Sequence, residues 1–262
     1  MIESAKLPLL LKELRLSSML KSWETYANEA REKSYSYEKF LADLSEQEVS
    51  SRYTKRIQGY TKQSKLPVGK TLSTFDFKHA KHINRLQVES MTDSAQWVKD
   101  AENILIFGAS GVGKSHLAVA IGYSLIEKGV RILYMQASKI VQELQLARKE
   151  YRFPQMLTRL SRSPVLILDD IGYAKKDVGE ISVLFDLIAD RYESTSLIIT
   201  ANQPFSEWDQ IFQDNMMAVA AIDRLVHHAT IIEVEEKSYR QTHAKDNDIC
   251  EKIVEVKNEI EN

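Results

Sequence analysis

Residues 108–115, with the sequence GASGVGKS, fill every fixed position of the phosphate-binding loop pattern, and no other feature constrains the fold as much. The apolar residues 104–107 before them predict a short buried strand, and residues 116–127 after them predict a helix. A glycine-rich turn in this setting points backbone N–H groups at phosphate oxygens, and the helix N-terminus adds partial positive charge. The chain is therefore expected to bind a nucleoside triphosphate.

Two side chains of this loop have expected roles of their own. Lys114 is expected to reach the β- and γ-phosphates, and the Ser115 hydroxyl to bind Mg²⁺, so that ATP and Mg²⁺ are the expected cofactors. A glycine-rich strand-to-helix turn without a ligand is the alternative. The predicted nucleotide-binding residues within the loop and just after it are Gly108, Ala109, Ser110, Gly111, Val112, Gly113, Lys114, Ser115 and His116.

From Asn103 onward the apolar segments alternate with helical patterns, which is typical of a parallel sheet with helices on both faces. The pattern predicts strands at 104–107, 131–135, 165–169, 197–201 and 230–234, and helices near 114–128, 138–149, 152–162, 179–194 and 215–226.

The chain before this region is predicted to be helical. Leucines at positions 9, 10, 14 and 16 indicate one short helix, residues 18–31 a second, and a third begins at Ser36, a plausible N-cap, and ends near Pro67. The predicted division is a helical domain at 1–66, a basic connector at 67–100 anchored by Phe75 and Phe77, an ATPase domain at 101–245 and a helical tail at 246–262.

Polar residues follow two of the predicted strands. Asp169 and Asp170 end the buried run from 165, and in a P-loop sheet the first acid is expected beside Mg²⁺ and the second where it can polarise the attacking water. Asn202 ends the strand 197–201 and is expected near the γ-phosphate, where it can orient the water. Ordinary loop capping and an ordinary turn are the respective alternatives.

Two arginines near the C-terminal end are candidates for contacts with phosphate. Arg224 lies near the end of an apolar helix, where an arginine of a ring or filament ATPase projects into the neighbouring subunit's site as a finger supplied in trans. The alternative is a surface pair with Asp223. Arg240 is expected to contact phosphates within its own subunit.

The charge of the chain is distributed unevenly. The net charge of its 262 residues is −2, but residues 49–74 carry six basic residues and no acidic one, with tyrosines interleaved. This pattern favours binding to the phosphate backbone of double-stranded DNA, although a solvated basic helix face looks similar. The candidate DNA-binding residues are Arg52, Lys55, Arg56, Lys62, Lys65 and Lys70.

Cysteine usage and hydropathy bound the environment. Cys250 is the only cysteine, which excludes a disulfide framework and a Cys-based zinc site within one chain. No apolar run approaches the length of a membrane span, and the N-terminus lacks a signal-peptide pattern. We expect a soluble, cytoplasmic protein without membrane partners.

Taken together, several motifs resemble the IstB family of AAA+ helper ATPases from insertion sequences, a branch of the group that includes the DnaC helicase loaders. The resemblance covers nearly the whole chain. It rests on the segments GKSHLA at 113–118, DDIG at 169–172, DRL at 223–225 with His227 and His228, and SYR at 238–240.

The resemblance implies an α/β AAA+ P-loop NTPase with a five-stranded parallel sheet, in the order 5-1-4-3-2, and a small N-terminal all-α domain. It also implies an ATPase that forms homo-oligomers on DNA, deforms the DNA and recruits or activates the transposase of its own element in DNA transposition. A helicase loader of the DnaC type is the main alternative. A metabolic P-loop kinase is a third, weakened by the absence of an obvious acceptor-binding lid.

Overall fold

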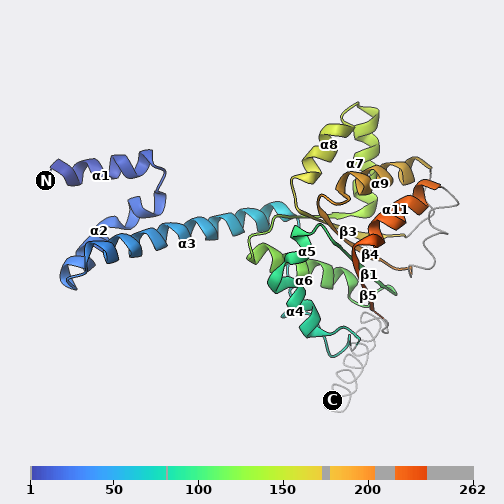
Figure 1. Cartoon of the computed structure of the whole chain (residues 1–262), viewed down its shortest axis with the longest axis horizontal. Helices are drawn as coiled ribbons and strands as arrows, with labels where there is room; N and C mark the ends of the chain where they lie inside the picture. Colours follow the sequence, from blue (N-terminus) through green and yellow to red (C-terminus); the bar gives the residue numbers. More distant parts are fainter. Residues whose placement is uncertain (1, 81, 173–177, 204–215, 235–262) are drawn as a thin grey trace, which may run out of the picture. The chain divides into compact units, whose positions relative to one another are not determined.

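The computed structural model describes residues 2–80, 82–172, 178–203 and 216–234. The chain divides into two compact units, Met1–Gly59 and Tyr60–Asn262, and each is described by itself (Figure 1). Within the described residues, no helix combines the length and apolar character that crossing a membrane requires.

The first unit is helical. It contains α1 (Ile2–Glu13), α2 (Ser17–Glu32) and most of α3 (Tyr37–Ser64), which agrees with the three predicted helices. Leu11, Met19 and Leu44 form a small buried core. Ser36 caps α3 as predicted, because its hydroxyl accepts a 3.2 Å hydrogen bond from the backbone N–H of Lys39.

A buried carboxylate joins α3 to the start of α2. Glu48 is 3% exposed, and one of its oxygens accepts hydrogen bonds from the backbone N–H groups of Ser18 (2.7 Å) and Met19 (3.0 Å). Arg52, one turn further along α3, holds the other oxygen at 2.8 Å and also donates to the carbonyl of Arg15. Glu48 thus acts as an N-cap for α2 supplied by another helix.

The second unit is built on a parallel sheet of five strands in the order β2-β3-β4-β1-β5, which confirms the predicted order 5-1-4-3-2. Ile198 of β4 pairs with Ile104 of β1 on one side and with Ile167 of β3 on the other. These central strands are buried on both faces, as is usual in a parallel sheet. The strands are β1 (Asn103–Gly108), β2 (Ile132–Gln136), β3 (Val165–Ile171), β4 (Ser196–Ala201) and β5 (Ala229–Val234).

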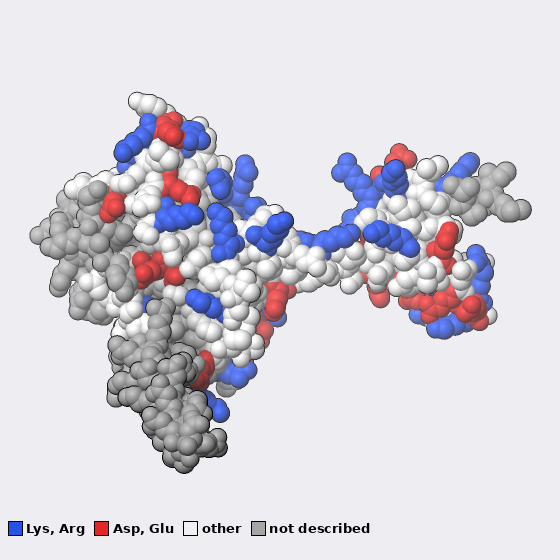
Figure 2. All heavy atoms as spheres, turned by 180° about the vertical axis from the view of Figure 1, so that it is seen from behind, with Lys and Arg blue, Asp and Glu red and all other residues white. Residues whose placement is uncertain are grey.

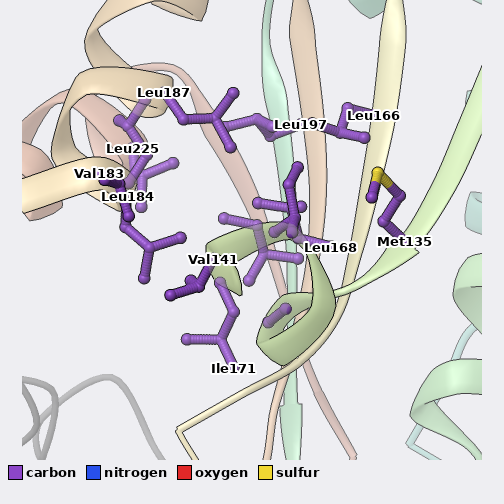
Figure 3. Packing of buried hydrophobic residues seen from close by; sticks show 14 of the residues in the cluster. Met135, Val141, Leu166, Leu168, Ile171, Val183, Leu184, Leu187, Leu197 and Leu225 are labelled. Carbon is purple, nitrogen blue, oxygen red and sulfur yellow. The ribbon is translucent and has the colours of Figure 1, made fainter. Parts of the chain in front are cut away.

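Helices cover both faces of this sheet (Figure 1). On one face, α6 (Lys114–Glu127) packs so closely that a Cβ at Gly122 would lie 2.9 Å from the Ile167 side chain. On the other face, apolar side chains of the sheet and of the helices converge in one core, as Figure 3 shows for Leu168, Leu187 and Leu225. The helices of that face are α7 (Ala137–Lys149), α8 (Phe153–Ser161), α9 (Val178–Arg191) and α11 (Met216–His227).

The predicted connector contains two helices that the sequence pattern did not indicate, α4 (Arg85–Ser94) and α5 (Gln96–Lys99). Asn84 caps α4 by accepting hydrogen bonds from two N–H groups of its first turn. Phe75 is an anchor, as predicted, because it is 8% exposed and its ring packs against Phe77 at 4.8 Å and His116 at 5.3 Å. The connector is therefore part of the second unit's packing.

Candidate nucleotide-binding site

The phosphate-binding loop lies between the end of β1 and the start of α6, where the sequence predicted it. Gly108 has φ +147°, and a Cβ there would lie 2.4 Å from the carbonyl oxygen of Val234 on β5. Gly113 has φ +102°, and a Cβ there would press against the Phe75 ring at 3.2 Å. Both positions therefore require glycine for steric reasons that are independent of any ligand.

Lys114 is buried at the first position of α6, with 5% of its surface exposed. Its Nζ donates 2.7 Å hydrogen bonds to the carbonyl oxygen of Ala109 and to the side-chain oxygen of Asn202. The lysine thus ties the loop to the end of β4. A buried ammonium held by neutral oxygens is suited to exchange them for the charged oxygens of a phosphate.

Asp169 is held at the end of β3 by two hydroxyl groups. Tyr134 of β2 donates a 2.6 Å hydrogen bond to one carboxylate oxygen, and Thr200 of β4 donates a 2.6 Å bond to the other. Side chains alternate along a strand, and the register places all three residues on the face of the sheet that α6 covers. The carboxylate is therefore fixed on the same face as Ser115.

A β-bulge gives Asp170 a different orientation from the one that simple alternation predicts. The β3–β4 register shifts between Leu168 and Ile171, and Asp170 has φ +67° while its N–H donates to the Thr200 hydroxyl at 2.8 Å. The Asp170 carboxylate accepts a 2.8 Å hydrogen bond from Asn202 and lines the cavity beside the loop. Burial raises the pKa of Asp170, the hydrogen bond from Asn202 opposes that rise, and the charge of Asp169 adds to it.

The cavity at this site has a volume of about 420 Å³. One wall is the loop with Asp170 and Asn202, and the other comes from the connector at 70–80. His116 joins the two walls, because its Nε2 lies 3.2 Å from both the Thr71 carbonyl oxygen and the Thr74 hydroxyl. Burial lowers the pKa of His116, against the effect of the Thr71 carbonyl, and this favours a neutral ring.

Arg224 lies near the N-terminal ends of the strands, whereas the phosphate-binding loop lies at their C-terminal ends. Its neighbour Leu225 has a carbonyl oxygen that accepts a 3.2 Å hydrogen bond from the side chain of Asn103, the first residue of β1. The loop leaves β1 at Gly108, five residues and about 17 Å further along. The guanidinium packs over the rings of Phe185 and Tyr192, and its Nη1 is buried without a hydrogen-bond partner among the described residues. Arg224 is therefore not part of its own chain's nucleotide site.

The structure divides the candidate DNA-binding residues into three sets. Three of them make contacts within the first unit. Arg52 donates to Glu48, Lys55 donates to the Ser17 hydroxyl at 3.0 Å, and Arg56 packs over the Tyr53 ring. Lys62 and Lys65 line a second cavity of the second unit. Lys70 lines the nucleotide cavity instead and is not grouped with the others. Arg240 and the predicted helical tail at 246–262 lie outside the described residues.

Sequence reasoning missed several residues of this site. Tyr134 and Thr200, which fix Asp169, and the cavity wall formed by Thr74, Asp76 and His79 were not among the predicted site residues. The alternation of side chains in the predicted strands carried a signal for the first two. The predicted anchors Phe75 and Phe77 indicated that the connector packs on the ATPase domain, but no pattern in the sequence located that contact at the loop.

The sheet order, the loop and the acidic end of β3 show that this protein has the AAA+ P-loop fold. The fold is similar to that in the crystal structure of the DnaC helicase loader, with a TM-score of 0.53 and 19% identity over 64% of this chain and 97% of that one. It is similarly close to AMPPCP-bound DnaA from Aquifex aeolicus, with a TM-score of 0.54 and 19% identity over 70% of this chain and 56% of that one.

The family follows from the sequence comparisons. Residues 9–247 match the model of the IstB-like ATP binding proteins, and the chain belongs to this family. It is 43% identical to an insertion sequence ATP-binding protein of Sinorhizobium fredii, over 93% of this chain and 82% of the relative. It is 36% identical to the ATP-binding protein of insertion sequence IS21 from Pseudomonas aeruginosa, over 90% of this chain and 88% of that one. The predicted family is therefore confirmed.

Proposed function

We propose that this protein is an ATPase that assembles on duplex DNA and acts with the transposase of an insertion sequence. The observation that carries the proposal is the convergence of Lys114, Asp170 and Asn202 on one cavity beside the phosphate-binding loop. The names of its relatives, insertion sequence ATP-binding proteins, support ATP as the nucleotide and transposition as the process.

The residues of the loop and of the end of β3 fit ATP with Mg²⁺. The Ser115 hydroxyl and the Asp169 carboxylate are oxygen ligands of the kind that Mg²⁺ prefers. Asp169 is already oriented by Tyr134 and Thr200, as metal-binding carboxylates usually are. Bound Mg²⁺ supplies neutralisation of charge on the phosphates. Lys114 would exchange its bonds to Ala109 and Asn202 for bonds to phosphate oxygens.

Asp170 and Asn202 have separate roles in the proposed hydrolysis. In this proposal Asp170, which follows the bulge and lines the cavity, accepts a proton from the attacking water, and its raised pKa makes the carboxylate a better base. Asn202 holds that carboxylate and can orient the same water through its amide. The Asn202 oxygen also accepts a hydrogen bond from Lys114. A bound triphosphate that draws Lys114 away would free the Asn202 amide to orient the water.

The position of Arg224 supports an assembly of several subunits. Arg224 lies near the start of β1, away from the phosphate-binding loop of its own chain, and in this proposal it acts on the nucleotide of a neighbouring subunit. Such an arginine makes hydrolysis depend on assembly. The arrangement therefore favours a homo-oligomer in which ATP links adjacent subunits.

Exposed cations of both units support DNA as the surface on which the protein assembles. Lys55 and Arg56 on α3 and Lys62 and Lys65 near its end are exposed and can neutralise phosphates without reading bases. Arg52 is less suited to this role, because it is engaged with Glu48 and the Arg15 carbonyl. DNA binding of this kind would be largely independent of sequence.

Co-precipitation distinguishes transposition from helicase loading. The tagged full-length protein is mixed with the transposase of its own element or with the replicative helicase, in the presence of duplex DNA and ATP. We expect capture of the transposase that depends on ATP and is lost in the Lys114→Ala variant. Capture of the helicase but not the transposase would overturn the proposal in favour of a loader.

A further inference from the structure

A second cavity of about 420 Å³ lies in the second unit, away from the nucleotide site. It is formed where α3 ends, β2 begins and α8 ends. All strands of a parallel sheet run in the same direction. This cavity lies where β2 begins and the phosphate-binding loop lies where β1 ends, so the two are at opposite ends of the strands. We call it the basic groove; its cations are Lys62, Lys65, Arg131, Arg159 and Arg162.

The charge of the basic groove is of one sign. Five of its nine lining residues are cationic and none is acidic, in a chain whose net charge is only −2. None of the five forms an ion pair with a residue in the described part of the chain. Figure 2 shows Lys and Arg side chains gathered on this face where α3 ends. Like charges held together repel one another, so an anionic partner would stabilise the arrangement.

One wall of the groove is held by an internal arginine. Arg191 of α9 is 1% exposed, and it donates hydrogen bonds to the carbonyl oxygens of Leu160 (3.2 Å) and Ser163 (3.0 Å) and to that of Ser196 on β4 (3.0 Å). Burial lowers the pKa of Arg191 to about 10, so it stays charged at neutral pH. The turn that carries Arg159 and Arg162 is therefore fixed from the inside, while their side chains are exposed.

The opposite wall is equally constrained. Lys65 has φ +59° and stands between Ser64, which is fully buried, and Leu66, which is 7% exposed. The Ser64 hydroxyl donates to the Thr61 carbonyl at 2.7 Å and accepts from the Leu66 N–H at 3.2 Å. Both walls thus present cations from rigid backbone, which lowers the entropic cost of binding an anion.

We propose that the basic groove binds the phosphate backbone of duplex DNA and gives the second unit its own DNA contact. The inference rests on the proposed function and adds to it Arg131, Arg159 and Arg162 as phosphate-binding residues. Arginine binds phosphate with two parallel N–H bonds, and three separate segments supply the cations. A row of connected phosphates can engage several such cations at once, which a single free phosphate cannot.

The test compares two full-length variants that remove the same charge. Arg159→Gln/Arg162→Gln changes the groove, and Lys139→Gln/Lys149→Gln changes two exposed lysines of α7 outside it. Binding to a labelled duplex is measured with ATP between 50 and 300 mM salt. We expect the groove variant to bind about tenfold more weakly at 0.1 M salt and its log–log salt slope to flatten by up to about 1.8, since each phosphate contributes about 0.9.

Two control variants, the ATP affinity and competition by inorganic phosphate complete the test. The α7 variant is expected to keep the wild-type slope, and Arg159→Lys/Arg162→Lys to restore most of it, because lysine keeps the charge. ATP affinity is measured in all variants and is expected to be unchanged, which verifies their folding. Inorganic phosphate at constant ionic strength is expected to compete only weakly with the duplex.

Each outcome bears on a different part of the proposal. If the wild type binds the duplex and the groove variant keeps its affinity and salt slope, the basic groove is not a DNA contact, whereas DNA binding by the protein stands. Efficient competition by inorganic phosphate, lost in the groove variant, assigns the groove to a small anion and also overturns the inference. A wild type that does not bind duplex DNA overturns the DNA part of the proposed function itself.

Discussion

The Nζ of Lys114 donates a 2.7 Å hydrogen bond to the side-chain oxygen of Asn202, and this bond joins the start of α6 to the end of β4. The same amide donates through its nitrogen to Asp170 at 2.8 Å. Asn202 therefore links the lysine proposed to bind phosphate to the carboxylate proposed to act on water. A triphosphate that draws Lys114 away from Asn202 would alter the environment of Asp170 directly.

Replacement of Lys114 by alanine is expected to weaken ATP binding by about tenfold or more, because charge-assisted hydrogen bonds contribute about 1.5–3 kcal/mol. Titration with a fluorescent ATP analogue measures the loss. Lys139→Ala, a change at an exposed lysine of α7, serves as the control and is expected to bind normally. Undiminished affinity in Lys114→Ala would contradict the assignment of the loop.

Asp170→Asn is expected to keep ATP binding within about threefold while hydrolysis falls by about 10²-fold or more, the usual contribution of a general base. The variant removes the proton acceptor but leaves Asp169 and Ser115 for Mg²⁺. Phosphate release and nucleotide titration measure the two effects separately. Asp169→Asn is expected to weaken Mg²⁺-dependent binding instead, and equal defects in both variants would mean that the two roles are assigned wrongly.

Tyr134→Phe is expected to raise the Mg²⁺ concentration for half-maximal hydrolysis by about tenfold, because loss of a group that orients a metal ligand typically costs 10–100-fold in affinity or activity. The variant removes only the hydroxyl that donates to Asp169 at 2.6 Å. Tyr123→Phe, on α6, is a matched control, since within the described part of the chain its hydroxyl donates a hydrogen bond only to the Pro67 carbonyl, at 3.4 Å. The same Mg²⁺ dependence in both variants would argue against the role of Tyr134.

Mixtures of two inactive variants test Arg224. An Arg224→Ala subunit lacks the arginine it would offer to its neighbour but keeps an intact nucleotide site, whereas an Asp170→Asn subunit has the opposite defect. Mixing them is expected to restore part of the hydrolysis at interfaces that pair a good site with a good arginine. No recovery, in mixtures that co-assemble by light scattering, would leave Arg224 a structural residue packed on α9.

Glu48→Gln is expected to destabilise the first unit by about 2 kcal/mol at pH 7, because it weakens a buried N-cap and its bond to Arg52. Burial by itself raises the pKa of Glu48, but the hydrogen bonds from Arg52, Met19 and Ser18 outweigh it and lower the pKa. A lowered folded-state pKa means that the carboxylate stabilises the fold above the unfolded pKa of about 4.3 and that this contribution disappears as the pH falls through the folded value.

Amide hydrogen exchange of the full-length wild type and of Glu48→Gln, compared at equal pH, measures this difference in stability. Exchange in α2 is expected to be faster in Glu48→Gln at pH 7 and to converge with that of the wild type in acid. Glu46→Gln, at an exposed-side position two residues earlier on α3, is the control and is expected to exchange like the wild type. Equal exchange of Glu48→Gln and the wild type at pH 7 would rule out the capping role.

Much of this protein was determined by local sequence. The phosphate-binding loop, the five strands and the acidic end of β3 were predictable, because glycine spacing and continuous apolar runs act over a few residues and leave few alternatives. Tertiary structure decided what depends on residues far apart in the chain. The bulge that reorients Asp170, the hydroxyls of Tyr134 and Thr200 on Asp169, and the gathering of Arg131, Arg159 and Arg162 with Lys62 arise only when separate strands and helices pack together. Register and packing set those relationships, and no local pattern records them.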